Sequence, residues 1–265
     1  MEKINVIKVG GGVVEDTASL HRLLDSFAAM PGKKVLVHGG GRSATKMAAQ
    51  LGIERTMIGG RRITDARMLE VVTMVYGGMV NKNVVAGLQA RGVNALGLTG
   101  ADVNLIRSHK RPLKQVTLED GSTQMVDFGY VGDVDEANGD MLSKLLREGV
   151  VPVVAPLTHD GNGNLLNTNA DTIANEVACA LSPYYDVTLT FCFEKRGVLR
   201  DGNDEDSVIA HITETDFKAL TSQGIISGGM IPKLENAFQA ISRGVERVVI
   251  THADHPDGEG GTVIE

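Results

Sequence analysis

Short apolar strands alternate with helical patterns along most of this chain, and that alternation limits the folds it can adopt. The segment Val150-Val-Pro-Val-Val-Ala is apolar throughout, as a strand is when both faces of its sheet are buried. β-Branched runs at residues 4–9, 34–37, 150–154, 186–193 and 245–251 alternate with helical patterns at residues 17–29, 43–51, 141–148, 171–181, 214–222 and 233–242. The sequence therefore predicts an α/β fold with a largely parallel sheet between helical layers.

Two segments depart from this rhythm. Residues 113–131 contain Glu119-Asp-Gly-Ser between short polar strands, and Gly161-Asn-Gly-Asn precedes another short strand. Both carry the turn residues typical of β-hairpins. We expect hairpins on the rim of the sheet, where loops that cover a site can form.

The composition argues against nucleic-acid binding. The 265 residues carry a net charge of −7 with a pI near 5.5, whereas affinity for nucleic acid rests mainly on Lys and Arg. Aromatic residues make up 4% of the chain and tryptophan is absent, so platforms for stacking bases are not expected either. Any anion must therefore be bound by a local group of cations.

The sequence also gives no sign of membrane insertion or export. No run approaches the roughly 18 apolar residues of a membrane helix, and the first residues lack the pattern of a signal peptide. We expect a cytoplasmic protein that binds no membrane. Cys179 and Cys192 form no Cys-x-x-Cys pair and lie in apolar segments, which favours structural thiols.

Two lysines near opposite ends of the chain stand beside glycine clusters. Lys8 lies in Ile-Lys-Val-Gly-Gly-Gly and Lys233 in Gly-Gly-Met-Ile-Pro-Lys. A lysine supplies a compact positive charge, and glycines let backbone N–H groups approach phosphate oxygens closely. Together the two segments indicate a polyphosphate site.

A third glycine cluster follows a predicted buried strand in Val37-His-Gly-Gly-Gly-Arg-Ser-Ala. A helix that begins after such a turn presents free N–H groups to an anion. The pattern Gly39-x-Gly41-x-x-Ala44 also fits a permissive dinucleotide fingerprint, so a dehydrogenase that binds nicotinamide there is an alternative. Against it, Gly59-Gly-Arg-Arg stands about where the fingerprint expects an acidic residue.

Other polar residues are candidates for binding a carboxylate. Arg62 can bind one through two parallel hydrogen bonds, although Arg61 beside it is equally suited on physical grounds. In Asn167-Thr-Asn-Ala-Asp, Asn169 or a neighbour can cap the next helix, Asn167 can hold a carboxylate or amide, and Asp171 can keep lysines charged. The C-terminal His252-x-x-His255 is assigned to a polar loop, and no metal ligands are identified.

These motifs occur in an order that resembles the amino-acid kinase superfamily and, within it, the N-acetyl-L-glutamate kinases. The matching elements are Lys8-x-Gly-Gly, Val37-His-Gly-Gly-Gly, Gly60-Arg-Arg-Ile-Thr, Asn167-x-Asn-Ala-Asp, Gly224-Ile-Ile-Ser-Gly-Gly-Met-Ile-Pro-Lys and Gly261-Thr. The resemblance implies a three-layer αβα sandwich with a mostly parallel sheet. It also implies two lobes, with the acyl-amino acid bound by residues 1–181 and the nucleotide by residues 182–265.

The resemblance further implies roles for single residues. Lys8 and Lys233 would stabilise the transferring phosphoryl group, and Asp171 would orient them. The substrate would be bound by backbone N–H groups of Gly40 and Gly41 and by the side chains of Arg62 and Asn167. ATP would contact Gly10, Gly11, Gly197, Ile225, Ile226 and Ser227. The implied reaction moves the γ-phosphoryl group of ATP to the side-chain carboxylate of N-acetyl-L-glutamate in arginine biosynthesis, with Mg²⁺ held chiefly by the ATP phosphates.

One segment departs from the family pattern. Relatives usually end the nucleotide-lobe strand with an aspartate, whereas this chain has Phe191-Cys-Phe-Glu-Lys-Arg, so the ATP contacts of Glu194 and its neighbours stay open. Two alternatives also stay open, namely an N-succinyl-L-glutamate kinase and a non-catalytic amino-acid sensor. Because relatives inhibited by arginine carry an additional N-terminal helix, we expect a homodimer without that feedback.

Overall fold

One sheet of eight strands runs through the middle of the molecule in our computed structural model, which describes residues 1–58, 61–117 and 121–265. Its strands are β1 (Lys3–Val9), β2 (Lys33–His38), β5 (Ala95–Leu98), β10 (Val151–Val154), β13 (Asp186–Phe193), β14 (His211–Ile212), β15 (Arg247–His252) and β16 (Thr262–Ile264). Their order is β14-β16-β15-β13-β1-β2-β10-β5. Every neighbouring pair is parallel except β15 and β16.

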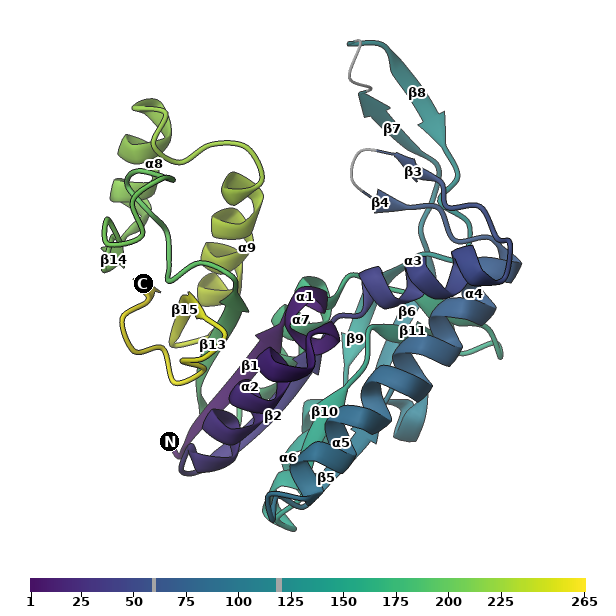
Figure 1. The fold of residues 1–265 in the computed structure, drawn as a ribbon, viewed down its shortest axis with the longest axis horizontal. Coiled ribbons are helices and arrows are strands. Elements are labelled where there is room, and N and C mark those ends of the chain that lie inside the picture. The colour runs from purple at the N-terminus through teal and green to yellow at the C-terminus, as the bar shows by residue number, and fades with distance from the viewer. Residues whose placement is uncertain (59–60, 118–120) are drawn as a thin grey trace.

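Helices cover both faces of this sheet (Figure 1). On one face, α6 (Gly139–Arg147), α7 (Ala170–Leu181) and α9 (Met230–Ser242) pack on the strands, and α8 (Glu214–Ser222) packs on α9. On the other face lie α2 (Thr17–Ala29) and α5 (Asn81–Gln89). Two groups of buried apolar side chains fill the two interfaces. The predicted three-layer αβα sandwich with a mostly parallel sheet is therefore confirmed.

The alternation of side chains along β1 decides where its lysine points. Ile4 and Val6 are buried in the same cluster as residues of α7, whereas Ile7 and Val9 belong to the cluster on the opposite face. Since successive side chains of a strand point to opposite faces, Lys8 shares the face of Val6. The strand thus directs Lys8 toward α7.

Two glycine turns follow the carboxyl ends of neighbouring strands. After β1 the chain enters the short helix α1 (Gly11–Glu15), and after β2 it enters α3 (Gly41–Gln50). The turns touch, because the N–H of Gly39 donates to the carbonyl of Val9 over 3.0 Å. This edge of the sheet is where ligands of open parallel sheets bind.

None of the helical ranges predicted from the sequence covers residues 66–89, which form one long helical segment. It consists of α4 (Ala66–Val72), η1 (Thr73–Val80), a π-helix, and α5. Gly77 and Gly78 lie inside it, and glycine in a helix interior is unfavourable by about 1 kcal/mol relative to alanine. Packing of Val75, Tyr76 and neighbouring residues against the core stabilises a helix that local propensity does not favour.

Small sheets and hairpins form the rim. They comprise β3 (Met57–Ile58), β4 (Arg61–Arg62), β6 (Ile106–Lys110), β7 (Lys114–Thr117), β8 (Thr123–Val126), β9 (Gly132–Ala137), β11 (Leu157–His159) and β12 (Leu165–Asn167), with a short 3₁₀ helix η2 (Asp102–Asn104). The pairs β7–β8 and β11–β12 are antiparallel and confirm the two predicted hairpins. Glu119 and Asp120 of the first predicted turn, and Gly59 and Gly60 of the arginine motif, lie outside the described residues.

The order of strands along the sheet partly follows their order along the chain. Strands from β13 onward form one end of it, and β1, β2, β10 and β5 form the other, so β1 and β13 meet at the seam. Hairpins β3–β4 and β7–β8 project together from the end that is distant from α8 (Figure 1). Within the described residues, no helix combines the length and apolar character needed to cross a bilayer.

Candidate active site

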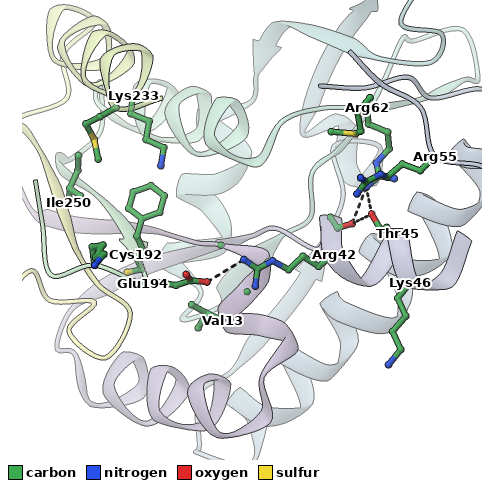
Figure 2. A pocket seen from close by; sticks show the side chains of 18 of the residues that line it. Val13, Arg42, Thr45, Lys46, Arg55, Arg62, Cys192, Glu194, Lys233 and Ile250 are labelled. Atoms are coloured by element: carbon green, nitrogen blue, oxygen red, sulfur yellow. Dashed lines mark hydrogen bonds and ion pairs between the residues drawn. The ribbon is translucent and has the colours of Figure 1, made fainter. Parts of the chain in front are cut away.

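A cleft of about 830 Å³ opens at the carboxyl edge of the sheet, across the seam between β1 and β13 (Figure 2). Its walls come from the glycine turn after β1, from α3, from the end of β13 and from the first turn of α9. Six residues with predicted roles line it, namely Gly10, Gly11, Gly41, Arg62, Gly197 and Lys233. Elements distant in sequence therefore converge on one site.

The cleft is strongly positive although the chain as a whole is acidic. Its basic lining residues are Arg42, Lys46, Arg55, Arg62, Lys195 and Lys233. In the part of the chain that the structure describes, Glu194 is the one carboxylate in that lining, and its Oε1 lies 3.4 Å from Nη2 of Arg42. Such a site suits an anionic ligand, as the sequence predicted for a chain of net negative charge.

Lys8 and Asp171 form a partly buried ion pair, and neither residue is among those that line this cleft. The Nζ of Lys8 lies 2.6 Å from Oδ1 of Asp171, with the Lys8 side chain 9% exposed. Asn169 caps α7 by accepting from the N–H groups of Asp171 and Thr172, as one reading of the sequence predicted. The cap fixes Asp171 in the first turn of α7, where a negative charge is also favoured by the helix dipole.

Lys233 approaches the same carboxylate from α9. Burial lowers the pKa of Lys233, the charge of Lys8 lowers it further, and the charge of Asp171 raises it. The geometry agrees, because Nζ of Lys233 and Nζ of Lys8 lie 3.8 Å and 5.3 Å from the centroid of the same ring, that of Phe193. Two lysines and one aspartate, which are 225 residues apart at the extremes, thus form one charged cluster.

The glycine turns are crowded against one another and against a tyrosine. A Cβ on Gly39 would lie 3.1 Å from the backbone nitrogen of Gly11, and a Cβ on Gly40 would lie 2.8 Å from Cδ1 of Tyr76. Among the residues that the structure describes, none accepts a hydrogen bond from the N–H groups of Gly11, Gly40 or Gly41. Those donors remain free to bind oxygens of a ligand.

The two residues predicted to bind a carboxylate do not meet each other directly. Nη2 of Arg62 donates to the carbonyl of Gly41 and to Oγ1 of Thr45, each over 2.9 Å. Nδ2 of Asn167 donates to Oγ1 of Thr64 over 2.9 Å, and Asn167 is not in the cleft lining. Nη1 of Arg62 also donates to Sδ of Met68 over 3.7 Å, so Nε–H and one N–H of Nη1 have no partner among the described residues.

A second cavity of about 660 Å³ adjoins the first. It contains Ile225, Ile226 and Ser227, and it shares Gly197 and Met230 with the larger cleft. The predicted nucleotide residues are therefore split, with Gly10 and Gly11 in one cavity and the residues around Ser227 in the other. Gly197 is tightly packed where the two meet, since a Cβ there would lie 2.7 Å from Oγ1 of Thr262.

Several lining residues were not predicted from the sequence. Arg42, Lys46 and Arg55 bring additional charge, and Phe193 brings an aromatic ring. Arg42 follows the glycine turn directly, and this position at the start of a helix is the one local signal that pointed to it. The other three reach the cleft only through tertiary folding.

Comparison with known proteins decides the family. Residues 3–252 match the amino acid kinase family. The chain belongs to this family. A protein of Bacteroides thetaiotaomicron named acetylglutamate kinase is 64% identical over 264 residues, which cover 100% of this chain and 99% of that protein. The protein of that name in Bacteroides fragilis is 63% identical, covering 100% of this chain and 97% of the other.

A solved structure agrees with the fold of this amino acid kinase. The structure of smu.665 from Streptococcus mutans has a TM-score of 0.77 at 27% identity and covers 98% of each chain. The chain is thus a phosphotransferase of the amino acid kinase fold, and the dehydrogenase alternative is set aside. The names of its relatives do not favour the succinylglutamate kinase or the non-catalytic sensor either.

The buried side chain of His38 is hydrogen-bonded to the glycine turn that follows β2. One ring nitrogen, Nδ1, lies 2.8 Å from the carbonyl oxygen of Gly39, and Nε2 lies 3.1 Å from Nδ2 of Asn81. These partners fit a neutral ring in which Nδ1–H donates and Nε2 accepts. Burial lowers the pKa of His38 to about 4, and the charge of Lys82 adds to that effect.

We therefore predict that His38 makes the stability of the fold depend on pH. In the unfolded chain His38 has its ordinary pKa of 6.5 and binds a proton below that pH. In the folded chain the same ring stays neutral until the pH falls to about 4. Stability from this group is thus complete above pH 6.5 and is lost as the pH falls toward 4. Urea denaturation from about pH 7 to about pH 5 should show a loss near 2 kcal/mol that His38→Gln lacks. Equal losses in both proteins would contradict it.

Proposed function

We propose that this chain is an acetylglutamate kinase that transfers the γ-phosphoryl group of ATP to the side-chain carboxylate of N-acetyl-L-glutamate, a step of arginine biosynthesis. The observation that carries the proposal is the charged cluster of Lys8, Asp171 and Lys233 at a cleft with glycine turns on one wall. Relatives of that name at 63% and 64% identity over the whole chain support the choice of acceptor. The need for ATP supports a cytoplasmic location.

The proposed reaction needs no proton transfer. A side-chain carboxylate is already ionised at neutral pH, so one of its oxygens can attack the γ-phosphorus directly. The new O–P bond forms as the bond to the bridging β–γ oxygen breaks, and ADP leaves with that electron pair. Negative charge on the moving phosphoryl group is stabilised by the ammonium groups of Lys8 and Lys233, while Asp171 keeps them oriented.

The acceptor would be held on the N-terminal side of the cleft. Free N–H groups of Gly40 and Gly41 would bind oxygens of the reacting carboxylate, since the turn presents them without a protein partner. The guanidinium of Arg62 would bind the carboxylate next to the amide. Asn167 would join that contact if it exchanged its hydrogen bond to Thr64 for one to the substrate.

The nucleotide would be held on the C-terminal side. Gly10 and Gly11 would contact the phosphates, and the second cavity, with Gly197, Ile225, Ile226 and Ser227, would hold the remainder of ATP. The positive lining of the cleft and its free backbone donors fit a polyphosphate, and Mg²⁺ would enter bound to the ATP phosphates. Residues 1–181 would thus form an acceptor lobe and residues 182–265 a nucleotide lobe, which meet at the β1–β13 seam.

The direct test combines Mg-ATP with N-acetyl-L-glutamate and measures both ADP release and trapping of the acyl phosphate by hydroxylamine. Lys8→Ala and Lys233→Ala should each lower turnover by a factor on the order of 10² or more, because they remove charge from the transition state. Lys144→Ala, at an exposed lysine on α6, serves as the control. Release of ADP that did not depend on the acceptor or on Lys8 would overturn the proposal.

Arg62→Ala should act mainly on acceptor binding. The carboxylate that Arg62 contacts takes no part in the bond changes, so its contact exists equally in ground and transition states. We expect KM for N-acetyl-L-glutamate to rise about tenfold or more with a smaller change in kcat. Arg67→Ala, at an exposed position on α4, is the matched control. An unchanged KM would remove Arg62 from the acceptor site.

The protein is also proposed to be a homodimer. β5 ends the large sheet at one side, and Leu96 on it is 40% exposed. Met74 and Met79, on the helical segment that precedes α5, are 53% and 42% exposed. A second copy that covered these side chains would bury apolar surface beside a free strand edge.

Light scattering should therefore give twice the mass of one chain. Met79→Asp should shift the protein toward the monomer, because a charge in a buried contact is unfavourable. Met125→Asp, at an exposed methionine on β8, should leave the mass unchanged. A monomeric parent protein would contradict the proposal.

A further inference from the structure

The ring of Phe193 lies close to both lysines of the charged cluster. Its centroid is 3.8 Å from Nζ of Lys233 and 5.3 Å from Nζ of Lys8. Both distances fall within the roughly 6 Å over which the face of an aromatic ring attracts a cation. One ring therefore contacts both ammonium groups that the proposed function places on the phosphoryl group.

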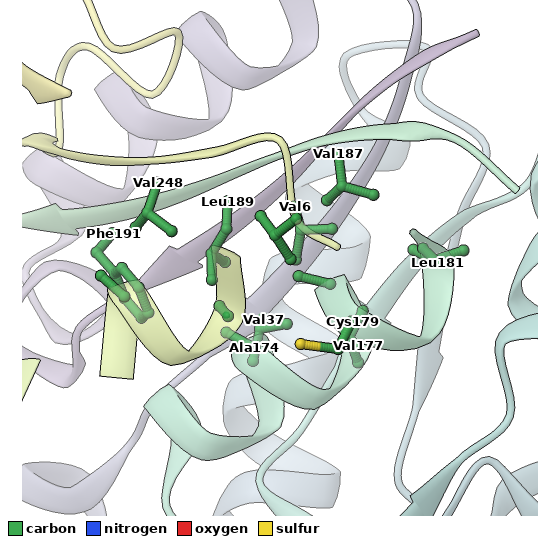
Figure 3. Packing of buried hydrophobic residues seen from close by; sticks show 14 of the residues in the cluster. Val6, Val37, Ala174, Val177, Cys179, Leu181, Val187, Leu189, Phe191 and Val248 are labelled. Atoms are coloured by element: carbon green, nitrogen blue, oxygen red, sulfur yellow. The ribbon is translucent and has the colours of Figure 1, made fainter. Parts of the chain in front are cut away.

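Strand register places the ring there. Lys8 of β1 pairs with Phe191 of β13, and Phe193 stands two residues further along on the same face. The rings of Phe191 and Phe193 stack with centroids 6.3 Å apart and an angle of 14° between their planes. Phe191 is buried with Leu189 and Val248 under the helices of this face (Figure 3). The ring of Phe193 is thus held in place by stacking on a buried side chain.

The ring face offers Lys233 a favourable contact, and several other features of its surroundings disfavour the charged form of this lysine. It lies in the first turn of α9, where the helix dipole disfavours a cation. Burial and the charge of Lys8 both lower its pKa, and Asp171 on α7 opposes them. Asp171 already lies 2.6 Å from Lys8, so it is shared between two cations. The carboxylate next to Phe193, Glu194, is paired with Arg42.

We propose that Phe193 is a positioning residue whose ring face holds the ammonium groups of Lys8 and Lys233 together above the end of β13. It acts through the lysines rather than on the reacting atoms. The catalytic half of this inference rests on the proposed function. Glu194, which stands where the family pattern has an aspartate, is paired with Arg42 rather than with either lysine.

The test replaces Phe193 by mono-, di- and trifluorinated phenylalanine in the full-length chain. Fluorine withdraws charge from the ring face but changes its size little, so packing is nearly kept while the attraction for cations falls in steps. Across the series we expect kcat to fall about fivefold and the titration of Lys233 to shift down by about half a pH unit. Carbon NMR of lysine labelled at Cε follows that titration without substrates, and Lys233→Arg assigns the signal.

Two comparisons separate positioning from packing. The same series at Phe191 should leave kcat within about twofold, because this ring stacks on Phe193 but has no cation over its face among the contacts of the described residues. Phe193→Tyr retains an aromatic face and should keep most of the turnover, whereas Phe193→Leu should lose as much as the trifluorinated ring.

The two readouts also separate this inference from the proposed function. If the pKa of Lys233 stayed the same across the fluorine series, the contact between ring and ammonium group would be contradicted. If that pKa shifted while kcat stayed the same, the positioning role would be contradicted. A shift that followed the series in a protein without acetylglutamate kinase activity would uphold the contact of ring and ammonium groups. The absence of acetylglutamate kinase activity in that protein would contradict the proposed reaction.

Discussion

The rest of this site depends on two partly buried ammonium groups that are held close together. Like charges repel, and burial disfavours each of them separately. The molecule offsets both effects with one shared carboxylate at the start of α7 and one aromatic ring at the end of β13. Neither partner removes the positive charge from the cleft, because Asp171 is a single negative group between two cations. The remaining positive field is what a phosphoryl group in transfer can use.

The parallel sheet makes this arrangement possible. Each strand delivers a different group to the same edge: β1 brings Lys8, the turns after β1 and β2 bring free N–H groups, and β13 brings Phe193. Helices α7 and α9 pack on one face and present their first turns at that edge. The chemistry therefore comes from strand ends and helix starts, while the buried apolar side chains below only fix their positions.

Much of the fold could be predicted from the sequence, because it rests on local patterns. Apolar strands and periodic helices indicated the αβα layers, and the glycine clusters beside Lys8 and Lys233 indicated two of the segments that line the positive cleft. The helical segment around Gly77 escaped prediction, since its π-helix is held by tertiary packing rather than by propensity. Phe193 escaped for a related reason: in the sequence it is one more apolar strand residue. Its contact with two cations exists only once β1, β13 and α9 meet.

The pairing of β1 with β13 fixes how far apart the groups at the ends of these two strands lie. It pairs Lys3 through Val9 with Asp186 through Cys192 without a break, and it joins the half of the sheet proposed to carry the acceptor to the half proposed to carry the nucleotide. A slip of one residue would turn Lys8 to the opposite face, and a slip of two would displace it by about 7 Å along the strand. The distance between the proposed donor and acceptor sites would thus be set by backbone hydrogen bonds, and an insertion or deletion in either strand would change that distance.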